Sequence, residues 1–288
     1  MYMKNTINSS VCPVNVIIKQ VADSLMEDLS ATGHDFTAEL IPPFNTITAS
    51  IQTNQDMVMC GRQWAELSFY ALDATVTIEW YVKDGDFVAA KTQLCKISGN
   101  ARSILTAERT ALNFMQALSG TATLVRTYVN AVSGNPVKIM DTRKTLPGLR
   151  LAQKYAVTVG GGYNQRIGLY DGVLIKENHI AACGGVTQAL ELAFKTVMAH
   201  IPIQIEVETF IQLQEAISAG AKNILLDNMS LTEIEKCVIY TDGRAEIEIS
   251  GNVTLDNIMQ YVNLGVDRIS IGALTKHIQA IDLSMRVV

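Results

Sequence analysis

The chain has 288 residues, of which 48% are hydrophobic and 18% are charged, enough apolar content for one large domain or two smaller ones. This balance excludes a disordered chain. The formal net charge of −5 argues against a general nucleic-acid surface, so a positive site must be local and built from a few converging cations. No apolar stretch is long enough to predict a membrane span.

The five cysteines form no Cys-x-x-Cys pair and are odd in number: Cys12, Cys60, Cys95, Cys183 and Cys237. We expect reduced, mostly buried thiols, which fit a reducing cytosol. The N-terminal sequence MYMKNTINSSVC lacks the apolar region of a secretory signal. The sequence therefore predicts a cytoplasmic protein.

The first hundred residues predict a mixed domain of helices and strands. Apolar residues recur at helical spacing over residues 14–29, and the alternating pattern of residues 45–60 predicts a strand. Residues 75–98 predict a strand, a turn at residues 83–86 and a second strand.

From Thr106 a long amphipathic run predicts a helix that is interrupted at Ser119 and Gly120. Six short apolar strands follow, each ending in polar residues: KIMDTRK, GVLIKEN, IQIEVET, NILLDN, AEIEISGN and RISIGA. This recurring unit indicates parallel β/α architecture and fits a barrel, in which all strand ends open on one face that carries the active site. An open doubly wound sheet is the alternative, although no GxGxxG motif follows a strand.

In a barrel the residues at the strand ends converge. Cations lie on the earlier strands, carboxylates on the middle ones and small residues on the last: Arg143, Lys144, Lys176, Glu206, Glu208, Asp227, Ser250, Gly251 and Gly272. The loop GGGYNQRIG, residues 160–168, adds Arg166. A single cation at a strand end is usually only a solvated charge, but here three segments carry them. Of Glu206 and Glu208, one can point into the mouth while the other faces elsewhere.

These residue types predict a ligand that is strongly anionic at one end. Arginine grips a carboxylate or phosphate through two parallel hydrogen bonds. A carboxylate such as Asp227, directly after an apolar strand, is costly to bury unless it is paired or binds a metal. Glycines beside Ser250 let backbone amides approach a phosphate. The other end of the ligand should therefore carry hydroxyls or a metal-bridged phosphate.

Three long strings, MDTRKTLPGLRLAQKYAV, GGGYNQRIGLYDGVLIKENHI and TAERTALNFMQALSGTATL, resemble the quinolinate phosphoribosyltransferases, the carboxylating nicotinate-nucleotide pyrophosphorylases. The resemblance covers nearly the whole chain. It implies an N-terminal α/β sandwich domain at residues 1–113, rejoined by a tail at residues 275–288. It also implies an incomplete, seven-stranded α/β barrel at residues 114–274, of the type II phosphoribosyltransferases. We expect the seventh strand near residues 155–160.

The resemblance implies transfer of phosphoribosyl from phosphoribosyl pyrophosphate to quinolinate with Mg²⁺, giving nicotinate mononucleotide, pyrophosphate and CO2 for NAD synthesis. It implies that a cationic wall for the dicarboxylate and the phosphates is formed by Arg143, Lys144, Arg166 and Lys176. Glu206 and Asp227 would serve the ribose and the magnesium pyrophosphate, holding the metal through the substrate or water, and with Lys144 they form the catalytic set. The 5′-phosphate loop would be Ser250, Gly251 and Asn252, with Gly272 nearby.

The resemblance also implies a homodimer, with higher oligomers left open, in which Arg109 reaches the neighbouring subunit's site. Three positions depart from the family pattern: Gln165 replaces a histidine beside Arg166, Asn252 replaces a glycine, and Lys276 stands where many members have histidine, with His277 next.

Two alternatives remain at this point. One is a related phosphoribosyltransferase that acts on another anionic acceptor, which Gln165 motivates because a substrate contact is where relatives would diverge. The other is an inactive binding protein on the same fold, against which the retained charges at the expected site argue.

Overall fold

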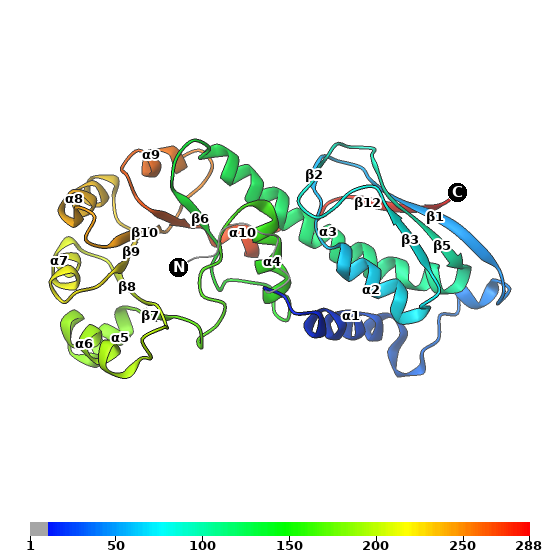
Figure 1. Cartoon of the computed structure of the whole chain (residues 1–288), viewed down its shortest axis with the longest axis horizontal. Helices are drawn as coiled ribbons and strands as arrows, with labels where there is room; N and C mark the ends of the chain where they lie inside the picture. The colour runs from blue at the N-terminus through cyan, green and yellow to red at the C-terminus, as the bar shows by residue number, and fades with distance from the viewer. Residues whose placement is uncertain (1–10) are drawn as a thin grey trace. The chain divides into compact units, whose positions relative to one another are not determined.

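The computed structural model describes residues 11–288, so the expectation about an N-terminal signal lies outside the described residues. The chain divides into two compact units. Among the described residues, unit 1 comprises residues 11–126, 145–161 and 274–288, and unit 2 comprises residues 127–144 and 162–273. The sequence-based boundary at residue 113 stays a prediction. Figure 1 shows an antiparallel sheet with helices in unit 1 and parallel strands with outer helices in unit 2.

Unit 1 is built on a four-stranded antiparallel sheet with the order β12-β1-β5-β3. The strands are β1 (Thr46–Thr53), β3 (Thr77–Trp80), β5 (Gln93–Asn100) and β12 (Leu283–Val287). The helices are α1 (Val14–Leu29), α2 (Arg62–Leu72), α3 (Ala101–Ala131), which continues into unit 2, α4 (Arg150–Gly160) and α10 (Ala273–Lys276). Two short 3-10 helices lie at Ser30–Thr32 and Ala38–Leu40.

The core of unit 1 joins the sheet to the helices. Ile51 of β1 and Ile97 of β5 are fully buried against Ile104 and Met115 of α3 and Phe69 of α2. A second apolar cluster joins α1, α2, α3 and α4 around Trp64, whose indole donates to Gln20. The helix predicted at residues 14–29 is confirmed as α1.

The strand, turn and second strand predicted at residues 75–98 are confirmed, because β3 precedes the turn at residues 83–86 and β5 follows it and pairs with β3 in antiparallel fashion. A further short strand between them, β4 (Phe87–Val88), pairs with β2 (Met57–Val58). The strand expected near residues 155–160 is wrong, since these residues belong to α4.

The predicted interruption of the long helix is also wrong, since α3 runs through Ser119 and Gly120 without a break. Both residues serve packing. The Ser119 hydroxyl bonds the backbone of Cys60 from both sides, accepting at 3.0 Å and donating at 3.1 Å. A Cβ at Gly120 would overlap the carbonyl oxygen of Gln279, so the glycine permits the C-terminal segment to approach the helix.

Unit 2 holds a six-stranded parallel sheet with the order β6-β11-β10-β9-β8-β7. Its strands are β6 (Lys138–Met140), β7 (Val173–Ile175), β8 (Ile203–Val207), β9 (Asn223–Asp227), β10 (Glu246–Ser250) and β11 (Arg268–Ser270). The connecting helices are α5 (Glu177–Cys183), α6 (Val186–Thr196), α7 (Phe210–Ser218), α8 (Leu231–Thr241) and α9 (Ile258–Val262).

The strand order distinguishes the barrel from the open doubly wound sheet. From β7 to β11 each strand adds beside the previous one, with β6 beyond, so the sheet winds in one direction. An open doubly wound sheet would reverse its order at a switch point, and this sheet has none. In Figure 1 the helices α6 to α9 lie outside the strands, as right-handed crossovers around a curved sheet require. A single parallel bridge between Met140 and Tyr163 extends the sheet beyond β6.

The α/β class, with a sheet domain and a parallel-strand domain, is therefore confirmed. The described residues give six strands rather than seven in the parallel sheet.

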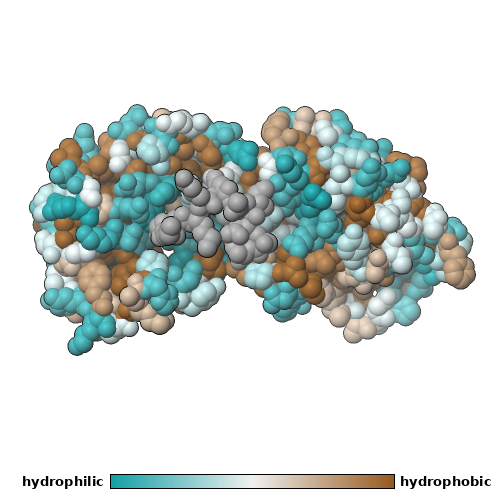
Figure 2. Space-filling model, viewed as in Figure 1, coloured by the Kyte–Doolittle hydropathy of each residue, from teal (hydrophilic) through white to brown (hydrophobic). Residues whose placement is uncertain are grey.

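All five cysteines are free, four of them buried, and burial raises the pKa of the Cys95 thiol to about 12. Within residues 11–288, no helix is both long enough and apolar enough to cross a bilayer. Figure 2 shows hydrophobic and hydrophilic residues interspersed over the visible face of both units.

Candidate active site

The carboxyl ends of the parallel strands in unit 2 carry most of the predicted site residues. Arg143 and Lys144 follow β6, Lys176 follows β7, and Gly272 follows β11. Glu206 lies in β8, while Asp227 and Ser250 end β9 and β10 and occupy paired positions in the sheet. Because parallel strands end on the same edge, these side chains share one face of the unit.

Lys176 and Glu206 form an ion pair on this face. The lysine Nζ lies 2.9 and 2.7 Å from the two carboxylate oxygens. Glu206 is buried, and this burial raises the pKa of its carboxyl group, while Lys176 opposes the shift and the charge of Asp227 adds to it. The two acids of neighbouring strands therefore feel each other's charge. Glu208 lies beyond the end of β8 and is exposed, so Glu206 is the glutamate that the structure pairs with a lysine.

Two arginines lie close enough to repel each other. Partial burial lowers the pKa of Arg166, the charge of Arg143 lowers it further, and Asp171 and Glu206 act in the opposite direction. The Arg166 guanidinium donates to the carbonyl of Gly172 at 3.1 Å. The Nε of Arg143 is buried and finds no hydrogen-bond partner among residues 11–288. Two neighbouring cations, one with an unused buried donor, suit an anion with several acceptor oxygens.

Lys144 lies over Gly272. A Cβ at Gly272 would come within 3.1 Å of the Lys144 Cδ, so the glycine leaves room for the stem of this lysine. The Lys144 side chain is exposed. The end of β6 is thereby joined to the end of β11, which is its neighbour in the sheet.

The turn after β10 has an unusual backbone. Gly251 and Asn252 have φ angles of 106° and 51°, and a Cβ at Gly251 would overlap the Asn228 side chain. Asparagine adopts the left-handed region more readily than most residues, so Asn252 keeps the backbone that a glycine would allow. The side chain of Asn257 donates to the Asn252 carbonyl at 3.0 Å. The departure at Asn252 therefore leaves the turn itself formed.

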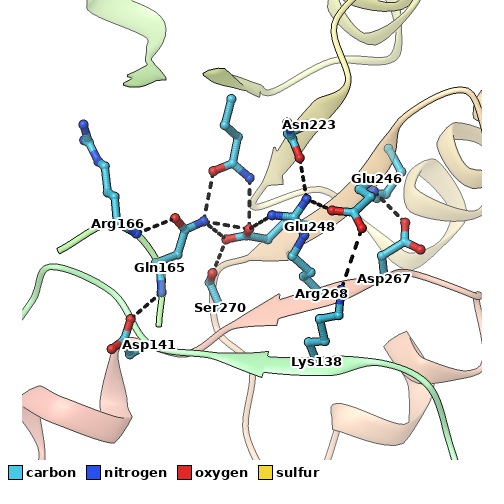
Figure 3. Close-up of polar contacts among 12 residues, drawn as sticks. Lys138, Asp141, Gln165, Arg166, Asn223, Glu246, Glu248, Asp267, Arg268 and Ser270 are labelled. Atoms are coloured by element: carbon cyan, nitrogen blue, oxygen red, sulfur yellow. Dashed lines mark hydrogen bonds and ion pairs between the residues drawn. The ribbon is translucent and has the colours of Figure 1, made fainter. Parts of the chain in front are cut away.

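Below these strand ends lies a buried polar network that sequence reasoning missed (Figure 3). Its centre is Glu248, which is fully buried on β10 and accepts hydrogen bonds from Gln165, Gln204 and Ser270. The guanidinium of Arg268 bonds Glu246 on the same strand and approaches Glu248 to 3.9 Å. A signal was available, because Gln204 and Glu248 lie two residues before Glu206 and Ser250 and hence on the same face of their strands.

A second buried acid was also missed. Asp141, directly after β6, is fully buried and accepts from the Gln165 backbone at 2.8 Å and the Asn164 side chain at 2.7 Å. It therefore fixes the loop that carries Arg166. Asp141 belongs to the string KIMDTRK, but the sequence interpretation assigned a role only to the cations that follow it, Arg143 and Lys144.

The remaining predicted residues belong to unit 1. Arg109 is exposed on α3, and Lys276 and His277 are exposed at the end of α10 and just beyond it. Their expected roles stay predictions. Within the described part of the chain, no group of three or more histidine, cysteine or acidic residues could hold a metal ion.

The parallel sheet winds in one direction and carries cations and two acids at the carboxyl ends of its strands. This arrangement is typical of the active site of an α/β-barrel enzyme that acts on strongly anionic substrates. The chain matches the family models of the quinolinate phosphoribosyl transferase N-terminal domain over residues 35–119 and C-terminal domain over residues 121–286. It therefore belongs to the quinolinate phosphoribosyltransferase family.

The chain resembles a probable carboxylating nicotinate-nucleotide pyrophosphorylase of Bacillus subtilis, with 39% identity over 91% of this chain and 90% of the relative. A chloroplastic enzyme of that name from Arabidopsis thaliana is 38% identical, covering 92% and 80%. The solved nicotinate-nucleotide pyrophosphorylase of Francisella tularensis superposes with a TM-score of 0.93 at 44% identity, covering 99% and 100% of the two chains.

Proposed function

We propose that the protein transfers phosphoribosyl from phosphoribosyl pyrophosphate to quinolinate with loss of CO2, giving nicotinate mononucleotide for NAD synthesis. The observation that carries this proposal is the set of cations beside two acids at the strand ends, in a chain that matches the family along nearly its whole length. The reaction needs both groups, because one substrate is a dicarboxylate and the other a sugar carrying phosphates.

Arg143, Arg166 and Lys176 would bind the two carboxylates of quinolinate. The buried, unused Nε of Arg143 supports this role, since a bound carboxylate oxygen would satisfy it. Lys144, exposed beside Gly272, would pair with a phosphate of the second substrate. The turn of Ser250, Gly251 and Asn252 would hold the 5′-phosphate through backbone amides.

Glu206 and Asp227 would act at the ribose. Departure of pyrophosphate leaves positive character at C1, which nearby carboxylates stabilise. The pyridine nitrogen then bonds to C1, and the ring becomes a cation. This charge stabilises the electron pair left on the ring carbon when the adjacent carboxylate leaves as CO2, and that carbon then takes up a proton from water. The protein supplies positioning and charge rather than a covalent nucleophile.

The donor set fits Mg²⁺ as part of the second substrate. This ion commonly binds through one or two carboxylates plus substrate phosphates, and Glu206 and Asp227 offer two carboxylates on adjacent strands. Bound there, Mg²⁺ would neutralise charge on the departing pyrophosphate. The protein's own part is to present these two carboxylates on adjacent strands, with Glu206 held in place by its ion pair with Lys176.

We also propose a homodimer in which Arg109 serves the partner's site. Arg109 is exposed on α3, and the same unit exposes three large apolar side chains in one short segment, Phe36, Leu40 and Phe44. Exposed apolar groups that gather in this way are typical of an interaction surface. The free cysteines support a reducing compartment, and we place the protein in the cytosol.

The test is turnover of the purified protein with phosphoribosyl pyrophosphate and Mg²⁺, comparing quinolinate with nicotinate as acceptor. We expect nicotinate mononucleotide from quinolinate alone, and loss of turnover when the metal is chelated. Turnover with nicotinate but not quinolinate would instead support the alternative, a related transferase with another acceptor.

A further inference from the structure

Glu248 is a buried carboxylate to which the proposed reaction assigns no role. It is fully buried in the middle of β10. Its two oxygens accept from the Gln165 amide at 2.8 and 2.7 Å, from the Gln204 amide at 2.9 Å and from the hydroxyl of Ser270. A buried charge is expensive to desolvate, and an uncharged or apolar side chain would usually fill such a site at less cost.

Charge balance with Arg268 is only part of the surroundings of Glu248. The Arg268 guanidinium hydrogen-bonds Glu246, which lies two residues earlier on the same strand, and forms a buried ion pair with Glu248 at 3.9 Å. The two carboxylate oxygens of Glu248 also accept hydrogen bonds from two neutral amides and a hydroxyl, which come from three other segments of the unit (Figure 3).

The amide of Gln165 links Glu248 to the substrate-facing loop. Its Nε2 donates to Glu248 and, at 2.9 Å, to the Oε1 of Gln204. Its Oε1 accepts from the backbone N–H of Arg166 at 3.0 Å. The carboxylate accepts hydrogen bonds only, so it orients the amide nitrogen inward and leaves the amide oxygen for Arg166.

The same loop is held from the other side by Asp141, which accepts from the Gln165 backbone. Figure 3 shows Gln165 between these two acids, with the Arg166 side chain extending away from the network. Arg166 is therefore held at two points: Gln165 accepts from its backbone N–H, and the Gly172 carbonyl accepts from its guanidinium. A shift of the amide would move the guanidinium relative to Arg143.

We propose that Glu248 is a positioning residue for quinolinate: through the Gln165 amide it holds Arg166 in the geometry that binds a carboxylate. This inference rests on the proposed function, because it takes Arg166 to contact quinolinate. It gives Gln165, which stands where the family pattern has a histidine, a role in holding Arg166 through its bonds to Glu248.

The first experiment compares Glu248→Gln with Glu246→Gln. Both substitutions remove one carboxylate from β10 beside Arg268, but only Glu248 contacts Gln165. A glutamine at position 248 keeps the volume but replaces one carboxylate oxygen with an NH2 group. Because the Gln165 Nε2 donates to both oxygens of Glu248, this new donor would face the donor of Gln165. For Glu248→Gln we expect the KM and the calorimetric Kd for quinolinate to rise about tenfold, the size expected from loss of a charged hydrogen bond. The KM for phosphoribosyl pyrophosphate should change less than about twofold.

Glu246→Gln should leave both KM values within about twofold of the wild type while lowering the thermal midpoint, because it breaks the same arginine cluster. Equal effects of the two variants on quinolinate binding would reduce Glu248 to charge balance and overturn the inference. An equal rise in both KM values for Glu248→Gln would overturn it as well, because that is the result of general loosening.

The second experiment is a double-mutant cycle with Gln165→Ala. If Glu248 acts through Gln165, Glu248→Gln should change quinolinate binding by less than about twofold in the Gln165→Ala background. A full tenfold loss in that background would show another route and contradict the inference. Should Glu248→Gln fail to fold, Gln204→Leu replaces it: it removes the second partner of the Gln165 amide, and we expect a smaller rise of about threefold in the same KM.

Assays of the wild-type protein distinguish failure of the proposed function from failure of the inference about Glu248. A wild-type protein that neither binds nor converts quinolinate overturns the proposed function, and this inference with it. A wild-type protein that converts quinolinate while the cycle is additive overturns the inference alone.

Discussion

The charge of Arg143 lowers the pKa of the neighbouring Arg166, and the Arg143 Nε is buried without a hydrogen-bond partner in the described part of the chain. Two adjacent cations repel, which costs stability unless an anion joins them. An oxygen ligand would satisfy this donor, which supports the role proposed for Arg143 in binding a carboxylate.

Arg143→Ala should lower kcat/KM for quinolinate on the order of 100-fold or more, since removing one partner of a buried charged pair costs about 2–5 kcal/mol. Arg244→Ala is the matched control, because Arg244 is exposed near the opposite, amino ends of the strands. Steady-state kinetics on both variants test this. Near-normal kinetics in Arg143→Ala would contradict the cationic-wall account.

Glu206 should make the stability of the protein depend on pH. Burial is the largest cause that raises its pKa in the folded state. A raised folded pKa means that the folded protein binds this proton more tightly than the unfolded chain. The contribution of Glu206 to stability is therefore present in full below the unfolded pKa and is lost as the pH rises through the folded pKa.

The free energy of unfolding of the wild type, relative to Glu206→Gln, should accordingly fall across that window as the pH increases. Urea unfolding of both proteins at a series of pH values measures this difference. A difference that rises with pH would mean that Lys176 outweighs burial and would reverse the assigned cause.

At the scale of single residues, the sequence predicted the cations and acids at the strand ends, because each stands where an apolar run stops. It did not predict the pairing of Glu248 with Gln165. That contact joins residues 83 positions apart in the chain, and no local pattern encodes such a pair. A period-of-two reading of IQIEV and EIEIS would have placed Gln204 and Glu248 below the strand ends, but not their partners.

At the scale of elements, the errors have a common physical cause. The family resemblance implied a seventh strand, which we expected near residues 155–160, yet these residues form the end of α4. Its small residues Ala152, Ala156 and Gly160 are buried at a spacing of four, and a Cβ at Gly160 would meet the Ala122 carbonyl of α3. Close packing against a neighbouring helix, which propensity does not describe, decided the structure.

Gly120 offers a test of the same kind of packing. In an exposed helix, replacing glycine with alanine stabilises a protein by about 1 kcal/mol. Here the added Cβ would overlap the Gln279 carbonyl, so Gly120→Ala should destabilise by about 1–3 kcal/mol. Chemical denaturation gives the sign directly. A more stable variant would mean that the C-terminal segment does not contact α3 at this point.

At the scale of the whole molecule, the sequence predicted two domains of different architecture, and the structure has an antiparallel and a parallel sheet. The pairing of β12 with β1 joins the end of the chain to a strand more than two hundred residues earlier. Only the resemblance to the family implied this return, because long-range strand pairing leaves no local signal. The comparisons confirm the family but leave the assembly as a proposal.

Subunit complementation tests that assembly. Arg109→Ala and Lys144→Ala alter residues of different units, and each should be nearly inactive alone. If Arg109 serves the partner's site, mixed dimers contain one site with both residues intact, and activity should recover to roughly a quarter of the wild type after random exchange. No recovery, after exchange is verified by native mass spectrometry, would contradict the shared site.

The central claim is that phosphoribosyl transfer is accompanied by loss of a carboxylate. The most direct measurement follows CO2, pyrophosphate and nicotinate mononucleotide in one reaction with quinolinate labelled in its 2-carboxylate. We expect the three products in equal amounts, each matching the phosphoribosyl pyrophosphate consumed. A nucleotide formed without labelled CO2, or no nucleotide from quinolinate, would contradict the account.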